Sequence, residues 1–292
     1  MNSHRTMIKY RLLYITLIGV VFVFIKLRYN VNVGSFRRHT DEFKDFNCDV
    51  NFAPFQSLPP VALISAPGSG NTWLRHLIEQ ATGIYTGSVF VDPELYDSGF
   101  LGEYDDWDSG RTIVVKTHTR NYHQMKRYPA AILLMRNAYT AIVTECNRML
   151  TLQKHTTFVE WNSETVNSQE FEKVINDTMN WWEDVAVKWL LGYTRPLHVV
   201  HYEDLVLDTE SQLINIVRFL NMTVSEERLK CVRRNMEGNF HKIRTVGDRA
   251  EELRALKGQR SRDIFQRMSK VSKLLAERGY KPLTTNIVFS GI

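Results

Sequence analysis

The chain has 292 residues, which is enough for one large domain or two small ones. Hydrophobic residues make up 43% of it and charged residues 24%, and these values exclude disordered, collagen-like and coiled-coil chains. The formal net charge is +5, but residues 1–40 carry seven Lys and Arg side chains and no acidic one, whereas residues 41–292 carry 30 basic and 32 acidic side chains. The body of the protein is therefore close to neutral, which argues against nucleic acid as a partner.

Near the N-terminus, residues 12–25 form an apolar run without a charged residue. The run is shorter than the roughly 20 residues of a typical transmembrane helix, but the basic residues at its two ends can extend their aliphatic stems into the apolar layer. We predict a cytoplasmic tail over residues 1–11, a transmembrane signal anchor over 12–27 and a stem over 28–59. A cleaved signal peptide and a buried core helix are the alternatives, although no small-residue cleavage site follows the run.

Basic residues before the apolar run favour a cytoplasmic N-terminus, so we expect a single-pass type II protein with a lumenal body. A short span suits the thin membranes of the early secretory pathway. The sequons at Asn176 and Asn221 are predicted glycosylation sites and are compatible with this placement. Cys48, Cys146 and Cys231 allow at most one disulfide, and their number leaves the redox compartment open.

Beyond residue 60, apolar runs typical of strands buried on both faces alternate with segments of helical periodicity. This alternation predicts one α/β domain over residues 60–292, a P-loop-like three-layer sandwich with a mostly parallel central sheet. Ligands of such sheets bind beyond the carboxyl ends of the strands. An acidic, Gly-rich stretch over 92–110 predicts a long solvated loop. The predicted strands are 61–65, 111–116, 130–135 and 196–201, and the predicted helices are 72–82, 137–152, 169–191, 211–220 and 248–278.

The turn after the first predicted strand contains two glycines, Gly68 and Gly70, and leads directly into a helix. Such a turn directs backbone N–H groups inward at a helix N-terminus, which makes a cradle for phosphate. A nucleotide kinase or ATPase would carry a Lys at the position of Asn71, so the pattern argues against ATP. An ordinary Gly-rich turn between a strand and a helix is the alternative.

Four motifs follow the four predicted strands in order. They are Pro-x-Ser-Gly-x-Thr-Trp from Pro67, Lys-Thr-His from Lys116, Arg136 with a hydroxyl residue eight positions later, and Tyr-Glu-Asp-Leu from Tyr202. In this order they resemble the sulfotransferases, which use 3′-phosphoadenosine 5′-phosphosulfate (PAPS) as sulfuryl donor; the resemblance covers residues 60–220 and is looser beyond. The details are most similar to the WSC-domain-containing Golgi sulfotransferases, thought to act on sialic acid, but the chain has no Cys-rich WSC module.

The resemblance implies which residues bind PAPS. Arg136 and Thr144 stand where the family holds the 3′-phosphate, and guanidinium and hydroxyl donors suit a dianion; a surface Arg and an ordinary helical Thr are the alternative. Trp73 and Tyr202 would contact the adenine, although Trp73 would equally fit a core position. No metal is implied, and the chain has no CxxC or HxxxH cluster. The residues implied at the 5′-phosphosulfate are Gly68, Ser69, Gly70, Asn71 and Thr72. Lys242 and Arg244 would belong to a basic loop over the 3′-phosphate, and a solvated basic turn is the alternative for them.

The Lys-Thr-His motif implies a catalytic pair. His118 would take the proton of the acceptor hydroxyl, because the imidazole pKa lies near neutral pH, and activity should then rise with pH through that pKa. Lys116 would stabilise the negative charge that develops on the leaving oxygen. A structural histidine is the alternative for His118. Many family members carry a Lys directly after the Pro of the loop, where this chain has Gly68, so Lys116 or Arg75 would supply the charge.

Other polar and aromatic residues of the domain have weaker assignments. Glu145 and His76 are the next candidate bases if His118 is not the base. Glu203 and Asp204 are predicted to cap the helix that follows them. A Trp-rich helix over 169–191 is predicted to pack on the sheet, with a sugar-stacking platform as the alternative. Its tryptophans are Trp181, Trp182 and Trp189.

The sequence thus predicts a Golgi membrane-anchored enzyme that moves a sulfuryl group from PAPS to a glycan hydroxyl, with sialic acid as one candidate acceptor. Its expected partners are a glycan or glycoconjugate acceptor and the membrane. The alternative is a catalytically weak or inactive anchored protein of the same fold that binds a glycan or a nucleotide, and the missing loop Lys favours it. A P-loop nucleotide kinase is disfavoured by Asn71.

Overall fold

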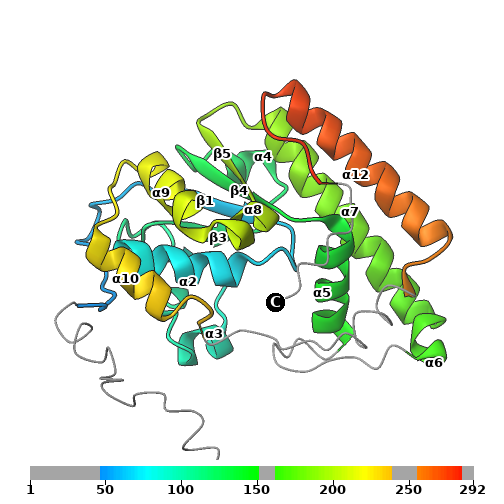
Figure 1. Cartoon of the computed structure of the whole chain (residues 1–292), viewed down its shortest axis with the longest axis horizontal. Helices are drawn as coiled ribbons and strands as arrows, with labels where there is room; N and C mark the ends of the chain where they lie inside the picture. The colour runs from blue at the N-terminus through cyan, green and yellow to red at the C-terminus, as the bar shows by residue number, and fades with distance from the viewer. Residues whose placement is uncertain (1–46, 151–161, 239–254, 285–292) are drawn as a thin grey trace, which may run out of the picture. The chain divides into compact units, whose positions relative to one another are not determined.

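The computed structural model describes residues 47–150, 162–238 and 255–284 (Figure 1). The chain divides into a segment that ends at Phe46 and a compact unit that begins at Asn47. The predicted tail, the predicted anchor and residues 28–46 of the predicted stem therefore lie outside the described residues. Within the described ranges, no helix is long and apolar enough to cross a membrane.

A five-stranded parallel sheet with the order β2-β3-β1-β4-β5 forms the centre of the unit. Its strands are β1 Ala62–Ser65, β2 Gly87–Ser88, β3 Val115–Thr117, β4 Ala131–Met135 and β5 Leu197–His201. β1 and β4 are buried along their whole length, as unbroken apolar runs predict. Ile64 of β1 is in register with Thr117 of β3 and Leu133 of β4, so these three strands end at the same edge. The predicted α/β class and parallel sheet are confirmed.

Two strands differ from the sequence prediction by more than one residue at their start. β3 begins at Val115 rather than at residue 111, although Ile113 and Val114 are buried as an apolar run predicts. β2 was not predicted, because a strand of two residues is too short to show an alternation of polar and apolar side chains.

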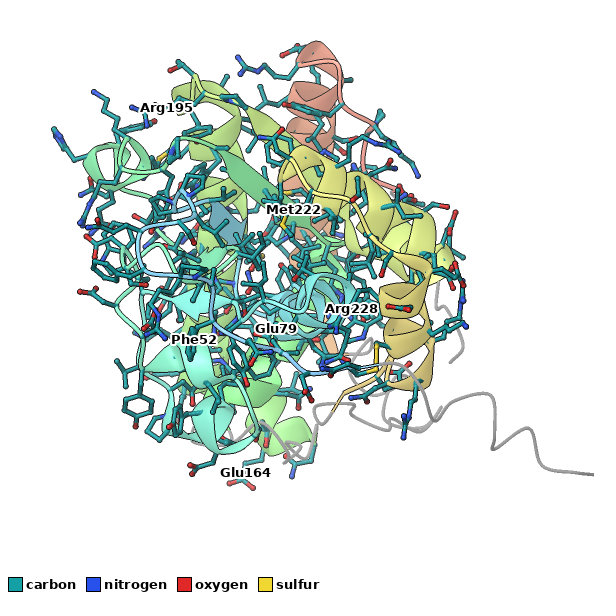
Figure 2. The ribbon with its side chains drawn as sticks, turned by 90° about the vertical axis from the view of Figure 1, so that its left-hand side faces the viewer. Phe52, Glu79, Glu164, Arg195, Met222 and Arg228 are labelled. Carbon is teal, nitrogen blue, oxygen red and sulfur yellow. A yellow bond between two sulfur atoms is a disulfide. The ribbon has the colours of Figure 1, made fainter. Side chains whose placement is uncertain are left out.

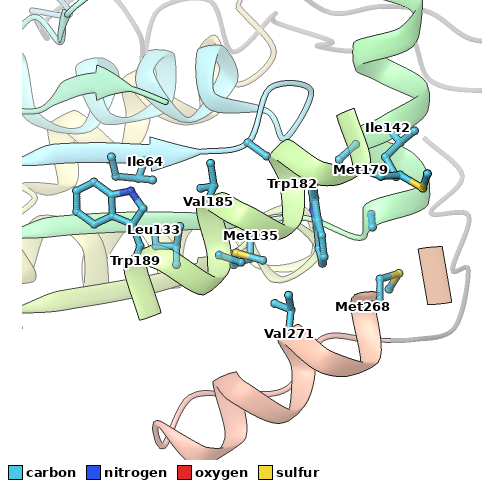
Figure 3. Close-up of a cluster of buried hydrophobic side chains, with 14 of the residues drawn as sticks. Ile64, Leu133, Met135, Ile142, Met179, Trp182, Val185, Trp189, Met268 and Val271 are labelled. Atoms are coloured by element: carbon cyan, nitrogen blue, oxygen red, sulfur yellow. The ribbon is translucent and has the colours of Figure 1, made fainter. Parts of the chain in front are cut away.

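Helices cover both faces of the sheet (Figure 1). Their bounds are α2 Asn71–Thr82, α3 Pro93–Asp97, α4 Tyr122–Met125, α5 Ala138–Leu150, α6 Ser163–Val166, α7 Gln169–Gly192, α8 Tyr202–Leu207, α9 Thr209–Phe219, α10 Glu226–Arg234 and α12 Gln259–Glu277, with a 3₁₀ turn η1 at Leu101–Glu103. Alternate residues of β1 point to opposite faces: Leu63 belongs to the core that α2 and α9 complete, whereas Ile64 belongs to the core that α5, α7 and α12 complete. Trp182 and Trp189 of α7 are buried in the second of these cores (Figure 3), which confirms that they pack on the sheet.

The acidic stretch over 92–110 is not the solvated loop that its composition predicts. It contains α3 and η1, and the carboxylate of Glu103 is fully buried in an ion pair with Arg75. Arg75 also donates through Nε to Thr86 Oγ1 at 2.8 Å and lies 4.7 Å from the ring centroid of Phe100. A long-range partner 28 positions away satisfies the acidic charge, and the local composition gives no sign of it.

The folded unit includes residues 47–59, which the sequence analysis assigned to the stem. Ala53 N donates to Arg111 O at 2.9 Å, and Cys48 forms a disulfide with Cys231 of α10. Arg228 of α10 donates to two carbonyl oxygens of the 47–49 segment and, at 2.9 Å, to Glu79 O in α2 (Figure 2). The N-terminal segment, α10 and α2 are therefore held together by one covalent bond and several hydrogen bonds.

Candidate functional site

The turn between β1 and α2 has a backbone that only glycine readily adopts at two positions. Gly68 has φ +77° and Gly70 has φ +92°, both in the left-handed region where a Cβ is disfavoured. A Cβ on Gly68 would overlap the carbonyl oxygen of Ala141 in α5, and one on Gly70 would lie 2.6 Å from the Tyr202 ring. The turn is pressed between α5 and Tyr202, so the Lys that many similar proteins carry at the position of Gly68 does not fit this backbone.

Buried polar atoms without a partner gather around this turn. In the part of the chain that the structure describes, Ser69 Oγ, Asn71 Oδ1 and Arg136 Nε are buried and accept or donate no hydrogen bond. Asn71 Nδ2 does donate, to Ser65 Oγ at 3.2 Å. An unsatisfied buried polar group costs about 1–3 kcal/mol, so several in one turn indicate a place where a bound group or water supplies the partners. Thr72 is half-buried in the first turn of α2.

Arg136, directly after β4, contacts both the turn and the start of α8, which follows β5. Its Nη1 donates to Gly68 O at 2.9 Å, and its guanidinium carbon lies 4.1 Å from the ring centroid of Tyr202, the first residue of α8. Trp73 meets the same ring edge-on at 5.5 Å and donates through Nε1 to Met236 O at 2.9 Å. The structure therefore brings together Gly70, Trp73, Arg136 and Tyr202, which three separate motifs predicted for one site.

Two other predicted contacts of this group stand differently. Thr144 lies on α5, and its hydroxyl donates back to Thr140 O in the same helix at 2.8 Å; its role at the 3′-phosphate stays a prediction. Lys242 and Arg244 lie outside the described residues.

His118 follows β3, and its protonation state can be assigned from one hydrogen bond. Its Nδ1 lies 2.7 Å from Ser65 O, and because a carbonyl oxygen only accepts, Nδ1 carries the proton and Nε2 keeps its lone pair. Burial, and then the charge of Lys116, lower the pKa of His118 to about 3. The imidazole is therefore neutral at physiological pH.

Lys116 lies on β3, two residues before His118. Burial, and then the nearby Arg75 guanidinium, lower the pKa of Lys116 to about 8. Its Nζ is 5.8 Å from the ring centroid of Phe90, and that ring is 5.5 Å from the His118 ring. Phe90 is a site residue that the sequence analysis missed, because a single aromatic after an unrecognised two-residue strand has no pattern around it.

The structure gives other partners to the remaining candidates. Arg75 is buried against Glu103, so it does not supply charge at the turn as the sequence suggested. Glu145 pairs with Arg148 at 2.6 Å, and His76 Nε2 lies 2.5 Å from Asn235 O.

Glu203 and Asp204 do not cap the helix that follows them. Glu203 Oε1 accepts from Asn137 N at the start of α5 at 2.9 Å, and Asp204 pairs with Lys281. Both lie inside α8, and Asp208 caps α9 instead.

The two sequons differ in accessibility. Asn176 is exposed on α7, but Thr178 of the same sequon is buried. Asn221 lies in an exposed turn after α9 with φ +58°. Within the described ranges, no group of three or more His, Cys, Asp and Glu residues is arranged to hold a metal ion.

A family model and curated relatives both place the chain in one family. The family model of the sulfotransferase domain matches residues 58–269. A WSCD family member of Drosophila melanogaster, CG9164, is 34% identical over 218 residues, which are 73% of this chain and 68% of that protein. Another from Aedes aegypti is 36% identical over 186 residues, 63% of this chain and 57% of that protein. A crystal structure of mouse sulfotransferase SULT7A1 complexed with PAP aligns with a TM-score of 0.49 at 15% identity, over 74% of this chain and 84% of that one.

Proposed function

Because the chain belongs to the sulfotransferase family, whose enzymes use PAPS, we propose that it transfers a sulfuryl group from PAPS to a hydroxyl group of a glycan, with sialic acid as the first acceptor to test. One observation carries the proposal: predicted donor-binding residues from three separate motifs meet around a turn whose buried polar atoms lack partners. We call the turn Gly68–Thr72 with Trp73, Arg136 and Tyr202 the donor half of the site, and Lys116 with His118 the reacting half.

The donor half fits a nucleotide with phosphate groups. Ser69 Oγ and Arg136 Nε are buried donors that lack partners among the described residues, and the first turn of α2 has no side-chain cap at Gly70. These groups, the backbone of the turn and the Arg136 charge would bind the phosphates. Trp73 and Tyr202 offer aromatic faces to the adenine. PAPS, when bound, supplies an activated sulfuryl group with the 5′-phosphate as its leaving group.

The reacting half fits proton transfer from an acceptor hydroxyl. The hydrogen bond to Ser65 O fixes the His118 tautomer in which Nε2 accepts, and the imidazole is neutral, so Nε2 is ready to take a proton without first losing one. Lys116, charged below pH 8, places positive charge next to His118, where it would stabilise developing negative charge. With Arg75 buried against Glu103, Lys116 takes the electrostatic role that the loop Lys has in many family members.

We also propose a lumenal, Golgi placement on the predicted N-terminal anchor. The Cys48–Cys231 disulfide supports this, because disulfides persist in the secretory pathway and are rare in the cytosol. The predicted anchor and the exposed sequon at Asn221 agree with it. The test is whether Asn221 is N-glycosylated in cells and whether the glycan is lost in Asn221→Gln. A chain without glycan and with reduced Cys48 and Cys231 would contradict it.

The decisive experiment is transfer of ³⁵S from labelled PAPS to soluble glycans. Sialyllactose, lactose and N-acetyllactosamine serve as probes, with and without EDTA, and we expect labelling of at least one of them and no effect of EDTA. Thermal stabilisation by 3′-phosphoadenosine 5′-phosphate (PAP), and not by ATP with Mg²⁺, tests donor binding separately. Binding of PAP without transfer to any acceptor would favour the alternative, a binding protein of the same fold, for which the missing loop Lys is the supporting observation.

A further inference from the structure

The tryptophans of α7 contact the backbone of both halves of the site. Trp182 Nε1 donates to Arg136 O at 3.1 Å, Trp189 Nε1 donates to Thr119 O at 2.9 Å, and Trp181 Nε1 donates to His118 O at 3.4 Å. Arg136 is the first residue after β4, and His118 and Thr119 are the first two after β3. All three indole groups of one helix thus bind carbonyl oxygens at the edge of the sheet where the site lies.

Each of these hydrogen bonds is matched to its position. The carbonyl groups just past the end of a strand have left the ladder and need donors from elsewhere, and an indole N–H is a donor only. Trp182 and Trp189 are buried, and a large ring locked in the core positions its N–H with little freedom. Packing in the core explains why large aromatic side chains occur at these positions. It does not require that all three indole N–H groups donate to carbonyl oxygens of functional residues or their neighbours.

We propose that these tryptophans are positioning residues that hold the two halves of the site in register. Trp182 holds the carbonyl group of Arg136 in place, and the Arg136 side chain contacts Gly68 and Tyr202 from that position. Trp181 and Trp189 fix the backbone of His118–Thr119, and the Trp181 ring also meets the His118 ring edge-on at 6.5 Å. Since α7 is one rigid element, it sets the position of His118 relative to Arg136. The inference rests on the proposed function.

Substitution of Trp by Phe removes the N–H and keeps an aromatic ring, so it tests the hydrogen bond apart from most of the packing. Trp182→Phe should weaken PAP binding about three- to tenfold and change kcat less, because a lost hydrogen bond of this kind shifts an equilibrium by that order. Trp189→Phe should lower kcat by about three- to tenfold and leave the Kd for PAP unchanged. Trp181→Phe, at a half-buried ring, repeats the second test if Trp189→Phe does not fold.

Trp107→Phe is the matched control. Trp107 is half-buried against Tyr128 and Arg127, with ring contacts of 5.6 Å and 4.0 Å, and neither neighbour belongs to the site. PAP binding by calorimetry, ³⁵S transfer to the best of the three glycan probes and the thermal midpoint are measured for each variant. The control should lower the thermal midpoint without a selective change in either the Kd for PAP or kcat.

The separation of effects decides the outcome. One outcome is that the α7 variants change Kd and kcat together, by similar factors, and only as far as they also lower the thermal midpoint, as we expect of the control. In that case the tryptophans act through packing alone and the inference is wrong. If the wild-type protein binds PAP and transfers sulfate while no variant shows the split, the proposed function stands and the inference falls. If the wild-type protein neither binds PAP nor transfers sulfate, the proposed function is overturned, and the inference with it.

Discussion

The two halves of the site lie at the same edge of the sheet but are built from different kinds of groups. In the donor half, a guanidinium, two aromatic rings and two glycines with positive φ pack directly on one another. In the reacting half, two titratable side chains lie two residues apart, and both have lowered pKa values. From this difference we expect that close packing and the Arg136 charge govern donor affinity, whereas the positions of protons govern the rate.

The largest expected effect is in the reacting half. His118→Ala removes the predicted base and should lower kcat by about 10²–10⁴-fold. PAP binding should stay near the wild-type value, because His118 is hydrogen-bonded to the carbonyl oxygen of Ser65, which is not part of the donor half. ³⁵S transfer and calorimetry with PAP measure the two quantities. Near-normal kcat in a folded variant would remove His118 from the mechanism and break the comparison.

Arg136→Ala tests the donor half. Loss of a charge-assisted hydrogen bond costs about 1.5–3 kcal/mol, which is roughly ten- to hundredfold in the Kd for PAP, and kcat at saturating PAPS should change less. Arg127→Ala is the matched control, because its guanidinium also lies over an aromatic ring, that of Trp107 at 4.0 Å, outside the site. An unchanged Kd for PAP in Arg136→Ala would show that the donor binds elsewhere.

Gly68→Ala tests whether the close packing of the turn matters beyond its backbone angle. Gly279 has φ +78°, almost the same as the +77° of Gly68, but a Cβ there meets nothing within 4 Å, whereas one on Gly68 would overlap Ala141 O. Both variants bear the cost of positive φ, so the additional loss in Gly68→Ala is the cost of the clash. We expect about 1–3 kcal/mol more destabilisation and loss of PAP binding, measured by denaturant unfolding and calorimetry. Equal effects of the two variants would mean that the turn tolerates a side chain.

The donor half was more predictable from the sequence than the surroundings of the reacting half. Arg136 and Tyr202 stand directly after strands with clear apolar runs, and Gly70 and Trp73 lie in the turn and the helix that follow another such strand. Parallel strands bring their carboxyl ends together. The burial of Arg75 against Glu103, the role of Phe90 and the disulfide of Cys48 depend on partners far away in the sequence. Short-range patterns contain no information about such partners.

The same limit explains why the pH dependence expected from the sequence needs correction. An ordinary histidine base would make activity rise with pH near 6.5, but the pKa of His118 is lowered to about 3, because its ring is desolvated and lies near a positive charge. The protonated fraction is then negligible throughout the range from pH 5.5 to 7.5. A rise of activity in that range has to come from another group.

The smallest expected effect is therefore on the alkaline side of the pH profile. Lys116 has a pKa of about 8, and its role requires the protonated form, so kcat should be flat from about pH 5.5 to 7 and fall as pH rises through about 8. Lys116→Arg keeps the charge, because a guanidinium stays protonated above pH 12, and should remove this fall even if kcat is lower overall. The measurement is kcat from pH 5.5 to 9.5 at saturating PAPS.

Two outcomes would contradict this prediction. A rise in wild-type activity between pH 6 and 7 that is lost in His118→Ala would show that His118 titrates like an ordinary histidine base. A fall near pH 8 that persists in Lys116→Arg would show that a group other than Lys116 causes the fall. Either result would show that the titratable pair does not set the rate in the way its two pKa values indicate.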